Sequence, residues 1–280
     1  ARLGPALLLR RGAPGGPAHG RRCTGRTSTW LVAQPADIAL QTQTAVNTIA
    51  LGNALRLSGQ PKDATDALQH AVEGFRLLVS GDPTNADLQR REAIALAYLA
   101  NAKLDLHDRV AAIDDYRAAI ALLQDLVASD PLNIRFRTDL TYMLFRQGGL
   151  LTAAGQSHAA RTFTTRGLTF LRLSAERPTA SAEDLNDYAW WLATCQPPDL
   201  RQPIRAIELS KRAVALAHSP NASYLHTLGC AYFGAGDRVH AVEALQRALT
   251  ILVPAPVGTP STGLRRRIAS GLGKFKREPI

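Results

Sequence analysis

Five copies of one small-residue pattern run through this sequence and restrict what it can fold into. In each copy an alanine is followed seven positions later by alanine or glycine and then by an aliphatic residue, starting at Ala64, Ala112, Ala160, Ala206 and Ala241. Positions seven apart lie on one face of a helix, and small side chains there let a second helix approach closely. Because one such unit cannot bury its own apolar face, the pattern predicts a stack of helical units that pack on their neighbours.

Two more positions recur at fixed distances before these alanines. A turn residue stands five positions earlier at Gly59, His107, Gly155 and Gly236. A small residue stands twelve positions earlier at Gly52, Ala100, Gly148 and Gly229. Glycine tolerates the left-handed conformation that ends many helices, and in the last copy Asp237 can cap the helix that follows. Each unit is therefore predicted to be two antiparallel helices joined by a tight turn.

The spacing of the units predicts long helices in the first three copies. Prolines that open the copies are separated by 48, 48, 47 and 42 residues, at Pro35, Pro83, Pro131, Pro178 and Pro220. Helices of about 20 residues, each about 30 Å long, fill the longer units. In the fourth unit the turn is longer and reads CQPPDLRQP before Ile204. We expect a disordered basic tail over 1–29, repeats at about 30–80, 81–128, 129–177, 178–218 and 219–254, and a linker with a basic capping helix over 255–280.

Charge is concentrated at the two ends of the chain. The formal net charge is +10, yet residues 1–26 hold six arginines without an acid, residues 255–280 hold six basic residues against Glu278, and residues 27–254 are nearly neutral. Towards the C-terminal end, an apolar stripe on a helix from about Ser261 predicts an end cap for the stack, formed by Leu264, Ile268, Leu272 and Phe275. The competing interpretation is that the basic ends bind nucleic acid or an anionic membrane. It is disfavoured because neither end interleaves aromatic residues with its arginines.

Residue patterns with known chemistry are sparse. Cys23, Cys195 and Cys230 show no C-x2-C spacing, which argues against structural zinc and disulfides and indicates a reducing compartment, the cytoplasm. None of the seven histidines belongs to an H-E-x2-H motif, so no metal site is predicted. No apolar run reaches the roughly 18 residues of a membrane span. We therefore predict neither an enzyme nor a cofactor-binding protein.

The most complete copy, residues 219–252, resembles the tetratricopeptide repeat. It carries L-x2-L-G-x2-Y from Leu225 to Tyr232, followed by Ala241, Leu245 and Ala248 at the family's offsets. The resemblance implies an all-α fold, a right-handed superhelical solenoid of antiparallel helix pairs with a C-terminal capping helix. It also implies a non-enzymatic scaffold that binds a protein or peptide segment in a concave groove.

A second resemblance concerns the D-P-x-N openings of the second and third units and the L-A-T-C segment before the enlarged turn. These features are similar to bacterial tetratricopeptide regions that follow serine/threonine protein kinase domains. The resemblance implies an alternative function, a regulatory or targeting region with a kinase domain in cis. The 280 residues contain no H-R-D or D-F-G motif and no Gly-rich loop with a following lysine, so this chain is not itself predicted to transfer phosphate.

The tetratricopeptide resemblance also implies which first-helix positions line the groove. The predicted peptide-binding set is Asn53, Arg56, Asn101, Tyr142, Phe145, Trp190, His226 and Phe233. Asn53 and Asn101 stand where peptide-binding members place an amide that holds a peptide backbone. The lysines that grip a terminal carboxylate in some members are replaced here by Ile49, Ala97, Phe145, Asn186 and His226, so a carboxylate clamp is not expected. Trp191, beside Trp190, is expected in the core between the last two repeats, and buried packing is favoured over ligand contact for the pair as a whole.

Overall fold

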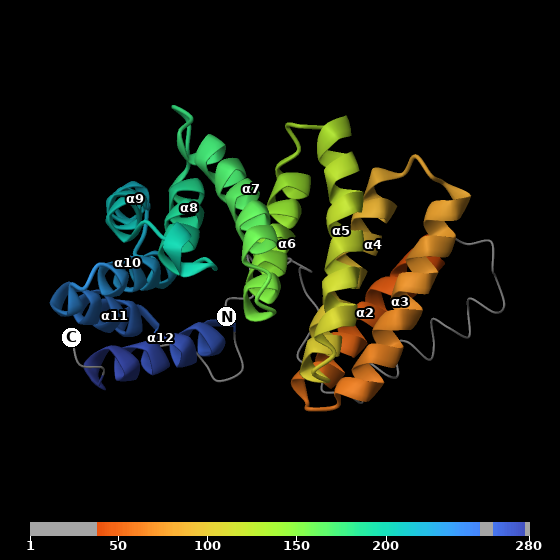
Figure 1. The fold of residues 1–280 in the computed structure, drawn as a ribbon, viewed down its shortest axis with the longest axis horizontal. Helices are drawn as coiled ribbons and strands as arrows, with labels where there is room; N and C mark the ends of the chain where they lie inside the picture. Colours follow the sequence, from red (N-terminus) through yellow and green to blue (C-terminus); the bar gives the residue numbers. More distant parts are fainter. Residues whose placement is uncertain (1–37, 253–259, 278–280) are drawn as a thin grey trace. The chain divides into compact units, whose positions relative to one another are not determined.

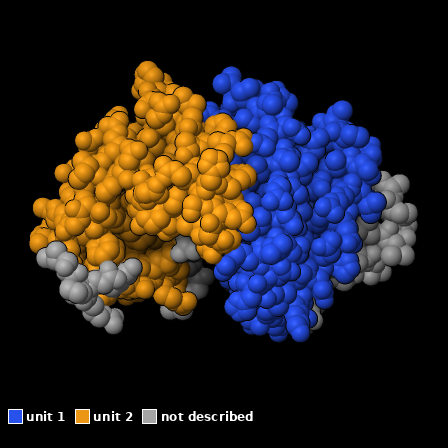
Figure 2. All heavy atoms as spheres, in the orientation of Figure 1, with its two compact units in different colours: residues 1–150 blue, residues 151–280 orange. Residues whose placement is uncertain are grey.

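The computed structural model describes residues 38–252 and 260–277, and within these ranges the chain forms eleven α-helices, one short 3-10 helix and no strand. The predicted all-α repeat architecture is confirmed. The tail expected over 1–29 lies outside the described residues, and so does the part of the expected 255–280 segment that precedes Pro260. The chain divides into two compact units, residues 1–150 and residues 151–280, which Figure 2 colours separately.

Long helices build unit 1. They are α2 (Ile38–Leu57), α3 (Pro61–Gly81), α4 (Ala86–Asp105), α5 (Arg109–Ser129) and α6 (Ile134–Ala153), which runs three residues past the boundary. Each has 20 or 21 residues, as the repeat spacing predicts. The pairs α2–α3 and α4–α5 form hairpins, and α3 packs against α4 (Figure 1). The core between them is built from fully buried apolar side chains: Leu68, Phe75, Leu99, Tyr116 and Leu123.

The predicted turn residues all adopt the left-handed conformation. Their φ angles are 75°, 62°, 74° and 85° for Gly59, His107, Gly155 and Gly236, respectively. In every case the next helix begins two residues later, at Pro61, Arg109, Ser157 and Arg238. The predicted cap is present as well, because the Asp237 carboxylate accepts a hydrogen bond from the His240 backbone at 3.2 Å. These turns confirm the register that the sequence pattern predicts.

Two of the predicted small residues mark close crossings inside a hairpin. A Cβ atom on Gly52 would lie 2.5 Å from Cγ of Leu68, and one on Gly229 would lie 2.7 Å from Cδ2 of Leu245. Both leucines occupy the same place in their repeats, four residues after the first alanine of the pattern. In these two hairpins, α2–α3 and α10–α11, the first helix packs directly against a leucine of the second, with no room for a side chain.

Unit 2 combines one long helix with shorter hairpins. Its elements are α7 (Ser157–Ala175), α8 (Ala182–Thr194), the 3-10 helix η1 (Pro198–Leu200), α9 (Pro203–Leu216), α10 (Ala222–Gly234), α11 (Arg238–Leu252) and α12 (Pro260–Arg277). The helices of the pairs α8–α9 and α10–α11 have 13 to 15 residues. One apolar cluster joins α8, α9 and α10, and a second joins α10, α11 and α12.

The enlarged turn between α8 and α9 folds back onto α7. The hydroxyl group of Thr164 donates a hydrogen bond to the backbone oxygen of Gln196, and Arg161 forms an ion pair with Asp199. Thr164 is fully buried. It is a polar residue at a position where the repeat pattern has a large apolar one, and this hydrogen bond gives the physical reason.

The last helix, α12, lies against α11 as the predicted cap. Ile268 is fully buried and Phe275 is 7% exposed, while Leu264 and Leu272 pack at the edge of the same cluster. The apolar stripe identified in the sequence therefore faces the end of unit 2.

Candidate functional site

The eight residues of the predicted groove fall in both units. Unit 1 contains Asn53, Arg56, Asn101, Tyr142 and Phe145, and unit 2 contains Trp190, His226 and Phe233. The two sets differ chemically, because polar side chains prevail in the first and rings in the second.

In unit 1, three helices meet in a polar network centred on a residue that sequence analysis did not select. Arg146 of α6 donates from Nη2 to Oδ1 of Asn101 on α4 at 2.7 Å, and from Nε to the hydroxyl oxygen of Tyr116 on α5 at 3.1 Å. The Tyr116 hydroxyl in turn donates to Oδ1 of Asn101 at 3.1 Å. The guanidinium carbon also lies 5.9 Å from the centre of the Tyr116 ring. The network holds Arg146 in one place relative to α4 and α5.

The amide of Asn101 is engaged within the protein. Its Nδ2 donates to the backbone oxygen of Ala97 at 2.9 Å, and its Oδ1 accepts from Tyr116 and Arg146. The resemblance implied that this amide would hold a peptide backbone. In this structure the amide binds the guanidinium group of Arg146, and its role toward a peptide stays a prediction.

A second arginine, Arg56 of α2, lies with acid and amide partners. Its Nη1 lies 3.1 Å from Oδ2 of Asp105, and its Nη2 donates to Oδ1 of Asn53 at 3.4 Å. Asp105 also contributes to the electrostatic environment of Arg146. The polar face of unit 1, which we define as Asn53, Arg56, Asn101, Asp105 and Arg146, thus carries two guanidinium groups and one carboxylate.

Arg146 has an unusual environment for a cation. In the described part of the chain no carboxylate forms an ion pair with it, and its hydrogen bonds go to neutral oxygens. Burial by itself lowers the pKa of Arg146, but the neighbouring Tyr116, Tyr142 and Asp105 outweigh this, so the pKa is raised and the group stays charged. Burial raises the pKa of Tyr116 to about 12, so its hydroxyl remains a neutral donor. Within the described part of the chain, Tyr116 and Asn101 engage two of the five N–H donors of Arg146.

The remaining predicted residues of unit 1 contribute unequally. Tyr142 is half-buried, whereas Phe145 is 4% exposed and belongs to the core. Arg146 directly follows Phe145, and no repeat pattern marks it. Its place in the polar network becomes visible only in the fold, where Tyr116 and Asn101 approach it from two other helices.

In unit 2 the predicted groove residues are covered by the chain's own rings. Trp190 is 9% exposed and His226 is 7% exposed, and their ring centres lie 5.4 Å apart. Phe233 stacks on Phe275 of α12. The expected order of the two tryptophans is reversed, since Trp190 is buried while Trp191 is half-buried. The expectation that Trp191 is the core residue is therefore wrong.

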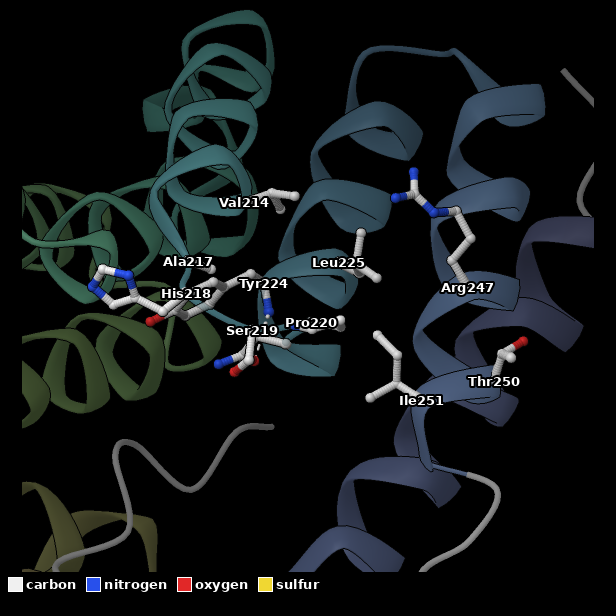
Figure 3. Close-up of a pocket in the computed structure, with 11 residues that line it drawn as sticks. Val214, Ala217, His218, Ser219, Pro220, Tyr224, Leu225, Arg247, Thr250 and Ile251 are labelled. Atoms are coloured by element: carbon white, nitrogen blue, oxygen red, sulfur yellow. Dashed lines mark hydrogen bonds between the residues drawn. The ribbon is translucent and has the colours of Figure 1, made fainter.

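A pocket of about 520 Å³ opens between α9, α10 and α11 (Figure 3). Its walls are mainly apolar, with Val214, Leu225 and Ile251, and Arg247 stands at its edge. None of the predicted groove residues lines it, so it is a feature separate from the first-helix faces.

The described residues form neither a metal site nor a membrane span. Within residues 38–252 and 260–277, no three histidine, cysteine, aspartate or glutamate side chains gather where they could hold a metal ion. None of the helices in these ranges has both the length and the apolar character needed to cross a membrane.

Comparisons with known proteins give structural likeness only. No family model matches the sequence, and no curated protein matches it. Among solved structures, BtubC (BKLC) from P. vanneervenii is 15% identical and aligns with a TM-score of 0.54 over 94% of this chain and 93% of that one. A thermophilic TPR protein of Thermus thermophilus is 21% identical, with a TM-score of 0.50 over 81% of this chain and 98% of that one. At these identities the likeness shows the fold and not the ligand.

Proposed function

We propose that this chain, which has a tetratricopeptide-like repeat fold, is a protein-interaction scaffold that captures a partner segment on the polar face of unit 1. The fold supports a scaffold because its repeats present first-helix side chains on rigid elements, and the TPR protein of Thermus thermophilus has this fold. Of the predicted groove set, this proposal keeps Asn53, Arg56 and Asn101 of unit 1 as binding residues.

The observation that carries the proposal is Arg146. A half-buried guanidinium that forms no direct ion pair binds a carboxylate strongly when one reaches it. Tyr116 and Asn101 fix its position before any ligand arrives, so little ordering is needed on binding. We therefore infer that the captured segment presents an acidic side chain to Arg146. Although lysines are absent from the expected clamp positions, Arg146 supplies a cation from the next residue along α6.

A display library of random peptides tests this proposal on the full chain. Peptides selected by the wild-type protein are expected to be enriched in Asp and Glu, and Arg146→Gln should abolish that enrichment. Arg117→Gln is the matched control, because it removes the same charge from unit 1 at a side chain that is 64% exposed. Equal enrichment of acidic residues by wild type and Arg146→Gln would contradict the assignment of the binding site to Arg146. Replacing Phe145 or Trp190 would test folding instead, since both are buried.

The kinase-associated alternative rests on the D-P-x-N and L-A-T-C segments alone. Its test is the coding sequence upstream of this chain. An open frame with H-R-D and D-F-G motifs would support it, and a stop codon just before Ala1 would exclude it.

A further inference from the structure

The C-terminal helix α12 covers a residue that the sequence assigns to the groove. Phe275 stacks on Phe233 of α10 with ring centres 3.8 Å apart and an angle of 7° between the planes. At the same point Arg238 of α11 donates to the backbone oxygen of Phe275 from Nη2 at 2.7 Å and from Nε at 3.1 Å. One aromatic contact and one arginine thus fasten this end of α12.

Phe275 completes a line of contacts along the first-helix face of unit 2. The line starts at Trp190 against His226 and continues at Cys230, whose Sγ lies 3.7 Å from Nε2 of His226. Cys230 and Phe233 both pack on the apolar cluster that includes α12. Helix α12 therefore covers the C-terminal end of the first-helix face of α10, where Phe275 packs on Phe233.

At Leu245 of α11, the backbone of α12 approaches less closely than the backbone of α10 does. A Cβ atom on Gly271 of α12 would lie 3.7 Å from Cδ1 of Leu245, an ordinary van der Waals distance, whereas one on Gly229 of α10 would lie 2.7 Å from Cδ2 of the same leucine. Helix α12 also contains Gly263, Gly271 and Gly273, and glycine weakens an isolated helix. Tertiary contacts hold α12 in place, and at Gly271 these contacts are less close than those at Gly229.

We propose that α12 is a displaceable cover over an interaction surface formed by α10 and α11. The surface accepts an amphipathic helix with the apolar spacing of Leu264, Ile268, Leu272 and Phe275. In the closed molecule α12 fills it in cis, and when α12 leaves, a partner helix of the same pattern binds there. This surface lies in unit 2 and is independent of the acidic-segment site in unit 1.

Thiol labelling of the full chain measures the opening of α12. In a Cys23→Ser background, the probe is Cys230, a half-buried thiol that packs on the apolar cluster to which α12 contributes. Cys195 is the internal reference, because it is fully buried in the enlarged turn and burial raises its pKa to about 11. Maleimide modification at pH 8 is followed by mass spectrometry for the parent chain, Phe275→Ala, Arg238→Gln and Arg265→Ala. A fluorescent peptide of residues 260–277 is titrated onto the same proteins.

Phe275→Ala is expected to raise the labelling rate of Cys230 by at least about tenfold, with Cys195 unchanged, and to let the peptide bind. Arg238→Gln keeps the ring contact and should give a smaller rise in the same direction. Arg265, which is exposed on α12, is the matched control, and its change should leave both readouts as in the parent chain.

Two results would overturn the proposal. One is unchanged Cys230 labelling with no peptide binding in both Phe275→Ala and Arg238→Gln. The other is a parallel rise at Cys195, because α12 would then belong to the cooperative core of unit 2 and could not leave it alone.

Discussion

The two units use the same turns but hold their helices together differently. In unit 1, ion pairs join helices, as in Arg90 of α4 with Asp139 of α6 and Lys103 of α4 with Asp115 of α5, both at 2.6 Å. In the described part of unit 2, the ion pairs join residues of one helix or involve a turn and are more exposed, as in Arg172 with Glu176. Helices of 20 residues have room for polar contacts beside an apolar core, and helices of 13 to 15 residues use their length for apolar packing.

This difference indicates how one repeat pattern can yield two kinds of surface. Polar links between neighbouring helices in unit 1 place charged groups at fixed positions, of which Arg146 is the example. Unit 2 buries its rings against one another and needs α12 to cover the end. The following substitutions test whether unit 1 depends on polar links between helices and unit 2 on close apolar packing.

The largest effect is expected from Asp139→Ala in unit 1. The side chains of Arg90 and Asp139 are 17% and 9% exposed, so the change leaves a largely buried arginine without its partner. We expect the free energy of unfolding to fall by about 3 kcal/mol, measured by urea denaturation. Asp87→Ala is the control, because Asp87 pairs with Arg91 on the surface of the same helix. Equal losses from the two variants would show that the buried pair between helices of unit 1 stabilises the protein no more than a surface pair does.

Next in size is Gly229→Ala in unit 2. The new methyl group would lie 2.7 Å from Leu245 Cδ2 and 3.2 Å from the backbone oxygen of Ala241, so α10 and α11 must separate. A loss of about 2 kcal/mol is expected from thermal or urea unfolding. Gly74→Ala is the control, because its Cβ would only touch Ala45 at 3.6 Å. A Gly229→Ala protein as stable as wild type would show that the hairpins are not closely interlocked.

Thr164→Val should have a smaller effect on unit 2. The change keeps the shape of the buried side chain but removes the hydrogen bond to Gln196 in the enlarged turn. The oxygen of Gln196 loses that donor, and we expect a loss of about 1 kcal/mol in chemical denaturation. Thr169→Val is the control, since the hydroxyl of Thr169 bonds to the backbone of its own helix on the surface. A loss no larger than in this control would show that the hydrogen bond from Thr164 to the enlarged turn does not stabilise unit 2.

The smallest effect is expected from Arg172→Ala. The side chains of Arg172 and Glu176 are both 48% exposed, and pairs of this kind contribute about 0.3 kcal/mol. Unfolding curves of this variant should overlay those of the wild type within error. A loss above about 1 kcal/mol would show that surface pairs stabilise unit 2 as well.

The sequence predicted the features that repeat and missed those that occur once. Gly59, His107, Gly155 and Gly236 recur at one offset, so the turn register and the long helices follow from spacing alone. Arg146 could not be found in this way, because its role depends on side chains from α4 and α5 that meet only in the fold. The same holds for Trp190 and Trp191, whose burial is decided by the helices around α8.

One buried residue has no structural explanation. Gln147 of α6 is fully buried, and both its amide atoms are without a hydrogen-bond partner in the described part of the chain. The repeat pattern has a large apolar residue at this position, and nothing in the structure explains the glutamine.

The enlarged turn between α8 and α9 changes how unfolding can spread through the chain. In a simple repeat stack each helix is coupled only to its neighbours, so a single hairpin can open by itself. Here Thr164 and Arg161 of α7 bind residues that come after α8 in the sequence. Helix α8 therefore cannot detach while the turn stays on α7. The segment from α7 to α9 should behave as one cooperative block, with amide hydrogens that exchange at a common rate, in a chain whose other hairpins exchange separately.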